Sequence, residues 1–286
     1  VKIYLCTFLK LTIFITGLSS SPSMNYLYTN EIKAMLYSFG DSKNPSLQTA
    51  QYLESVLKTQ IQRFLSAANN IRICRRGKLI NLEDIGFVIR KDPFKLRRLL
   101  NFIHFKEIKG KLESKLEFHS SEAEFTDIKP LCEDNVENKS DIDSNSAKIE
   151  PDIFKITNDE KKFSWMLPVQ GTDTFQLNRL LEIDNLTANM SKDEYLEFAE
   201  CRQSSFVYRK NKKFREFIGG WRIHDNIMDV LGYICYEMVY NIATMVLTLR
   251  DKRRGYKVKF GQSIPISTDE IDEVCWLILK ENRLFF

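Results

Sequence analysis

The sequence predicts an all-α protein made of two helical blocks, and three observations support this prediction. Two long stretches, 46–74 and 225–253, carry apolar residues at helical spacing with no interrupting proline. Shorter helical patterns flank each stretch. Residues 110–165, between the blocks, hold 14 acidic and 8 basic residues and few large apolar side chains. Such a composition favours a disordered segment.

These patterns divide the chain into four parts. We expect an extension outside the fold at 1–23, a first block at 27–108, an acidic flexible linker at 109–185 and a second block at 186–286. The extension begins VKIYLCTFLKLTIFITGL and looks like a secretory signal, but it opens with Val and Met24 follows closely. We expect translation to begin near Met24, and a true signal or membrane anchor is the alternative.

The first block opens with a short helix, which Thr29 or Asn30 caps and Gly40 ends. Pro45 marks the loop before the long helix at 46–74. A small domain cannot bury so long a helix by itself. The long helix therefore needs shorter helices at both ends, or a partner.

Two further helices complete the first block. Asn81 caps the first of them, with Asp84 three residues later, and Asp92-Pro93 supplies the cap and first turn of the next. Arg76 lies in the loop after the long helix. We expect it to form an ion pair within the fold, with Asp84 or Asp92.

The second block repeats this order of elements. Ser191 caps a preceding helix, and a short helix then ends at Gly219. The second long helix occupies 225–253, and Ser267 or Thr268 caps a last short helix. The repeated order predicts that the two blocks have the same fold.

Short helix, long helix, short helix is the order of the histone fold, a unit that buries its core by pairing head to tail with another such unit. Two units in one chain, joined by the linker, predict an intramolecular histone-fold pair. The positions expected to form the core of this pair are Leu53, Val56, Leu57, Ile61, Leu65, Ile227, Leu231, Ile234, Met238, Ile242 and Val246.

Particular phrases of the sequence also resemble known families. YTNEIKAMLYSFGDSKNP and NLEDIGFVIRKDPFKLRRLL resemble the histone fold of the thirteenth TBP-associated factor of TFIID. With LTANMSKDEYLEFAECRQSSFVYRKNKKFREFI and DNIMDVLGYICYEMV, the chain resembles the Spt3 family more closely. This resemblance covers 27–108 and 186–286.

The resemblance implies a non-catalytic, nuclear subunit of the SAGA coactivator. Such a subunit binds TATA-binding protein (TBP), helps deliver it to RNA polymerase II promoters, and has other SAGA subunits as partners. It implies no membrane, no small-molecule ligand and no cofactor. Two alternatives keep the histone folds: a histone-like DNA-binding protein and a TBP-associated factor of the TFIID type. A secreted protein is a more distant alternative.

Two groups of residues are candidates for partner contacts. Glu237 lies among Tyr233, Tyr240 and Asn241 on the second long helix, and a carboxylate among aromatic side chains suits the basic protein TBP. The alternative is a solvated or internally paired glutamate. The second group is a basic cluster for weak DNA contact or nuclear import. It consists of Arg209, Lys210, Lys212, Lys213 and Arg215. Solvated faces or protein contacts are the alternative for these cations.

Composition and motifs exclude several classes of protein. The net charge of +4 is too small to indicate a nucleic-acid binder by itself. The six cysteines include no CxxC pair, and we expect Cys74, Cys235 and Cys275 to be buried free thiols. The three histidines lie far apart, and the chain has no GxxxxGK[ST], GxGxxG or GxSxG motif. We therefore predict no metal site and no enzyme activity.

Overall fold

The structure is a computed structural model that describes residues 25–120, 173–256 and 260–280, without the side chains of 111–120. The predicted extension at 1–23 and the centre of the predicted linker lie outside these residues. The chain divides into two units, one of residues 1–96 and 170–286 and one of residues 97–169. Each unit is described by itself.

Apart from α6, which lies mostly in the predicted linker, the helices of the first unit follow the predicted order. Those from the first half of the chain are α2 (Thr29–Ser38), α3 (Leu47–Cys74) and α4 (Leu82–Ile89). Those from the second half are α6 (Thr174–Thr187), α7 (Lys192–Arg202), α8 (Asn211–Ile218), the 3₁₀ turn η2 (Asp225–Ile227), α9 (Met228–Arg254) and α10 (Thr268–Lys280). Among its described residues, the unit consists of helices and the loops that connect them, with two isolated β-bridges.

Several predicted helix starts are confirmed by hydrogen bonds. The Ser46 side chain accepts from the backbone N–H of Thr49 at 3.4 Å. Asn81 and Asp84 form a capping box, because the Asn81 side chain accepts from Asp84 N–H and Asp84 accepts from Asn81 N–H. Ser191 caps α7 in the same reciprocal way. These polar contacts fix where the helices begin.

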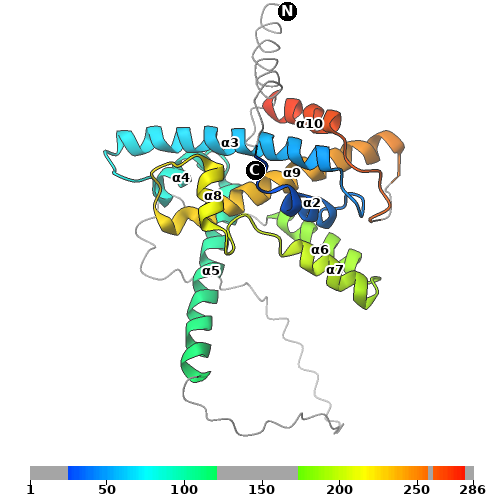
Figure 1. Cartoon of the computed structure of the whole chain (residues 1–286), viewed down its shortest axis with the longest axis horizontal. Coiled ribbons are helices and arrows are strands. Elements are labelled where there is room, and N and C mark those ends of the chain that lie inside the picture. Colours follow the sequence, from blue (N-terminus) through cyan, green and yellow to red (C-terminus); the bar gives the residue numbers. More distant parts are fainter. Residues whose placement is uncertain (1–24, 121–172, 257–259, 281–286) are drawn as a thin grey trace, which may run out of the picture. The chain divides into compact units, whose positions relative to one another are not determined.

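The two long helices, α3 and α9, pack against each other, and α10 contacts both of them (Figure 1). The eleven positions predicted for the pair core are all buried, each with at most 2% of its surface exposed. Residues 225–254 are also apolar and long enough to span a membrane, but 67% of the most hydrophobic window is buried in the fold. That burial is typical of a core helix.

Loops of the two halves meet at both ends of the long helices. Ile80, after α3, forms a parallel bridge with Ile223, before α9. Ser42, after α2, forms another with Gly261, after α9. The loop that precedes one long helix therefore pairs with the loop that follows the other, which is a head-to-tail arrangement.

An aromatic cluster also links the two halves. The Tyr28 ring lies edge-on to Phe206, Phe214 and Phe217, with centroids 5.1–6.4 Å apart. The Tyr28 hydroxyl donates to the Phe206 carbonyl at 2.9 Å. Each buried edge-to-face pair adds to the burial of apolar area, so the start of the first half is held by the second half.

Helices extend into both ends of the predicted linker. α5 (Pro93–Ser120) starts where predicted but continues to Ser120, and α6 includes residues 174–185. Lys, Glu and Leu are strong helix formers, so a count of charges does not separate a charged helix from a linker. The part between the two helices lies outside the described residues, and the flexible linker stays a prediction there.

Two expectations about single residues were wrong. Cys74 is exposed at the last turn of α3, whereas Cys235 and Cys275 are buried free thiols as expected. Arg75, rather than Arg76, pairs with Asp84: its Nε donates to Oδ1 at 3.0 Å and its Nη2 to Oδ2 at 2.9 Å. Arg75 keeps helical dihedral angles while Arg76 is left-handed, with φ of 59°. The sequence does not reveal which of two adjacent arginines takes the left-handed position.

Candidate functional site

The carboxylate of Glu237 is internally paired. Glu237 lies in the middle of α9, and only 5% of its side chain is exposed. Nη1 of Arg179, on α6, donates to Glu237 Oε1 at 2.7 Å. A buried carboxylate needs such a partner, since an unpaired charge in the interior is strongly destabilising.

Aromatic rings complete the surroundings of Arg179. Its guanidinium carbon lies 3.7 Å from the centre of the Tyr240 ring and 5.7 Å from that of Tyr236. Phe39, from the end of α2, lies edge-on to both tyrosines at 5.2 Å. We call the site formed by Glu237, Tyr236 and Tyr240 the arginine slot. It combines an ion pair with cation–π contacts.

The charges in the arginine slot act on one another. Burial alone would lower the pKa of Arg179, but the Glu237 carboxylate outweighs it and the pKa is raised. Burial raises the pKa of Tyr236, and the positive charge of Arg179 offsets part of that rise. Arg179 is thus a fixed cation at neutral pH, and the tyrosines beside it are neutral.

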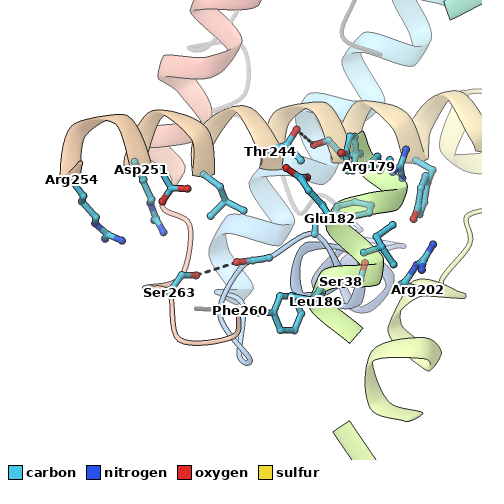
Figure 2. A pocket seen from close by; sticks show the side chains of 17 residues that line it. Ser38, Arg179, Glu182, Leu186, Arg202, Thr244, Asp251, Arg254, Phe260 and Ser263 are labelled. Atoms are coloured by element: carbon cyan, nitrogen blue, oxygen red, sulfur yellow. Dashed lines mark hydrogen bonds between the residues drawn. The ribbon is translucent and has the colours of Figure 1, made fainter. Parts of the chain in front are cut away.

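A cavity of about 220 Å³ adjoins the arginine slot. Figure 2 shows Arg179, Glu182 and Leu186 of α6 beside α9. Ser38, Phe260 and Ser263 also line this cavity (Figure 2). The lining of the cavity mixes apolar and charged side chains. Ligand pockets are usually lined mainly by apolar side chains, so this cavity resembles a contact between helices.

The structure brings together part of the predicted TBP contact. Glu237 and Tyr240 both contact Arg179, whereas Tyr233 and Asn241 are half-buried one turn to either side of Glu237. The prediction missed Arg179, because residue 179 was assigned to the linker. The spacing of Phe175, Arg179 and Ile183 was the available signal, since it places an arginine on an otherwise apolar helix stripe.

Most cations of the predicted basic cluster have partners within the fold. Lys210 and Lys213 donate to Glu31 of α2, at 2.7 and 3.1 Å. Burial would raise the pKa of Glu31, but these hydrogen bonds outweigh it and the pKa is lowered. Arg215 pairs with Asp225. Such pairing leaves less positive charge for phosphates than the sequence suggests.

The other two members of the cluster, Arg209 and Lys212, are exposed. The guanidinium carbon of Arg209 lies 5.2 Å from the centre of the Tyr208 ring. The backbone of Arg209 is left-handed, with φ of 56°. Among the described residues, no three His, Cys, Asp or Glu side chains gather as they would around a metal ion.

Comparisons with known proteins agree with this architecture. Residues 26–117 match the model of the family described as "Transcription initiation factor IID, 18kD subunit". The SAGA complex subunit Spt3 of Schizosaccharomyces pombe is 29% identical over 79% of this chain and 74% of its own length. The SAGA complex subunit SPT3 of Saccharomyces cerevisiae is 24% identical over 90% of this chain and 84% of its own length.

A shorter match links part of the chain to a second protein. Human transcription initiation factor TFIID subunit 13 is 35% identical over 28% of this chain and 63% of its own length. The Spt3 relatives, in contrast, align with 79% and 90% of this chain, so their matches include residues of both halves. On the strength of that similarity, the chain belongs to the Spt3 family.

Proposed function

We propose that this chain is a non-catalytic subunit of a SAGA-type coactivator complex, which binds TBP and helps deliver it to RNA polymerase II promoters. The observation that carries the proposal is the extent of the similarity to SAGA subunits, 79% and 90% of the chain. The match to TFIID subunit 13 covers 28%. A separate TFIID-type factor is therefore the weaker reading. The proposed location is the nucleus, and the proposed partners are TBP and other SAGA subunits.

The second half of the chain is proposed to be a histone fold as well. The short–long–short order in α8, α9 and α10 supports this, together with the packing of α9 on α3 and the two loop bridges. The pair buries apolar faces that would otherwise be exposed. A folded pair of this kind is a rigid platform for partner proteins.

The proposed TBP contact lies on α9 around Glu237, Tyr233, Tyr240 and Asn241. Aromatic side chains around a buried acid support it, because such groups anchor many protein interfaces. The chain carries no recognisable catalytic motif. Its proposed role is therefore to hold and present TBP rather than to modify it.

Binding of the purified full chain to purified TBP tests the proposal. We expect a one-to-one complex in analytical ultracentrifugation, and a monomer in the absence of TBP. Glu237→Lys should weaken the complex about thirtyfold or more, because disrupting a buried charge pair at an interface costs about 2–5 kcal/mol. Equal binding by Glu237→Lys and wild type would rule out this contact.

The DNA-binding alternative makes a different prediction. If the basic cluster held phosphates, DNA affinity would fall steeply with salt, with a slope near the number of phosphate contacts. Because Lys210, Lys213 and Arg215 have acidic partners, we expect weak binding and a shallow slope. Arg209→Ala with Lys212→Ala, compared in the same titration, shows whether the exposed pair accounts for it.

A further inference from the structure

α6 is attached to the fold in an unusual way. None of its residues is buried, although it is 14 residues long. Its inward stripe runs through Phe175, Arg179, Ile183 and Leu186, spaced four, four and three residues apart. The polar member of this stripe, Arg179, makes the ion pair with Glu237.

The outer side of α6 is exposed. Leu177, Leu180 and Leu181 are on its outer side and are 51–54% exposed. A helix of this length is marginally stable alone in water, and its attachment depends on the contacts of its inner stripe. Its release would therefore expose little new apolar surface from α6 itself, while removing the Arg179 cation from Glu237.

The chemistry of the arginine slot defines what else could occupy it. Tyr240 offers a ring face at 3.7 Å, and Glu237 accepts a hydrogen bond at 2.7 Å. A guanidinium satisfies both at once, because it is planar, permanently charged and weakly hydrated. An ammonium carries the same charge but has no flat face to lie against the ring.

We propose that α6 is a displaceable cover and that Arg179 occupies, within the chain, a slot that an arginine of a basic protein partner enters. The carboxylate of the buried Glu237 is negatively charged, so the partner group that enters the slot is expected to be a cation such as the arginine guanidinium. In its choice of partner this inference rests on the proposed function, so the partner tested is TBP. A slot closed by its own chain for about 90% of the time would bind an external arginine about tenfold more weakly than an open one.

Two variants of the full chain separate a cover from a binding element. Arg179→Ala and Glu237→Gln both remove the ion pair, so in both we expect amide hydrogen exchange in residues 174–187 to become about tenfold faster. Their effects on TBP should be opposite. Arg179→Ala should tighten binding by up to about tenfold, and Glu237→Gln should weaken it. Arg222→Ala, which removes an exposed arginine elsewhere, is the matched control and should change neither measurement.

Contrary outcomes are equally definite. If both variants weaken TBP binding, α6 is part of the binding surface and the cover is ruled out. If Arg179→Ala leaves the exchange of residues 174–187 unchanged, Arg179 does not hold the helix and the inference is also wrong. Arg179→Lys refines the result, since it keeps the charge and should still release α6 in part.

A probe without TBP keeps this inference distinct from the proposed function. N-acetylarginine methylamide should bind Arg179→Ala and shift the ring signals of its slot tyrosines in NMR spectra. It should bind wild type about tenfold more weakly, because the slot is occupied. It should also fail to bind the double variant with Glu237→Gln. Saturable binding in this series supports the slot even if wild type does not bind TBP, and equal binding to all three chains overturns it.

Discussion

At the scale of single residues, the buried carboxylate of Asp84 joins two structural roles. It is fully buried, accepts from the Asn81 N–H and pairs with Arg75. We expect Asp84→Ala to lower the free energy of unfolding by about 1–2 kcal/mol, since it removes one contact of the capping box and leaves the Asn81 N–H without this acceptor, while the exposed Arg75 stays solvated. Urea denaturation measures the change. As a control, Lys78→Ala replaces an exposed residue of the loop between α3 and α4 and should change the free energy of unfolding by less than about 0.5 kcal/mol.

Asp41 provides a residue-scale prediction about pH. Its Oδ1 accepts from the N–H groups of Ser42 and Ile266, while no described residue donates to its Oδ2. Burial raises the pKa of Asp41, the two backbone hydrogen bonds and Arg250 lower it in part, and the net shift is upward. The folded state therefore holds this proton more tightly than the unfolded state does, so the Asp41 contribution to stability is lost as pH rises through the raised pKa.

Asp41→Asn tests this sign. Asparagine keeps an acceptor for both amides but does not titrate. The stability of the variant relative to wild type should rise as pH increases from about 4 to 7. Chemical denaturation at several pH values measures the difference, and a difference that stays constant over this range would contradict the prediction.

At the scale of elements, α9 depends on a close approach to the loop before α8. A Cβ added at Gly232 would lie 2.4 Å from Cγ2 of Val207, whose side chain is buried. Alanine is the better helix former by about 1 kcal/mol, yet we expect Gly232→Ala to destabilise the protein by about 1–3 kcal/mol through overpacking. Adding Val207→Ala should recover part of the loss. Thermal unfolding of both variants decides whether packing or helix propensity dominates at this position.

How far the sequence predicts the fold also depends on the kind of element. Ser46, Asn81 and Ser191 begin helices where predicted, because capping is a local interaction between neighbouring residues. α6 was missed for the opposite reason. Its central inward residue is Arg179, and only the distant Glu237 makes an arginine suitable there. The same ion pair allows Glu237 to be buried, and the sequence of α9 alone does not predict that burial.

At the scale of the whole molecule, the two halves depend on each other for their cores. α3 and α9 belong to different halves, and the Tyr28 cluster and both loop bridges also join the halves. The connection through residues 121–172 should therefore be needed for concentration rather than for contact. A tether of this kind gives an effective concentration of about millimolar.

Cutting the chain between the halves tests this view of the pair. With a protease site inserted between Ser140 and Asp141, we expect the two cleaved fragments to elute together from a sizing column at micromolar concentration. The melting temperature should become dependent on protein concentration after cleavage but not before it, because folding is then coupled to association. The same chain left uncut is the control. Fragments that separate without denaturant would mean that the core shared by α3 and α9 cannot hold the pair without the tether.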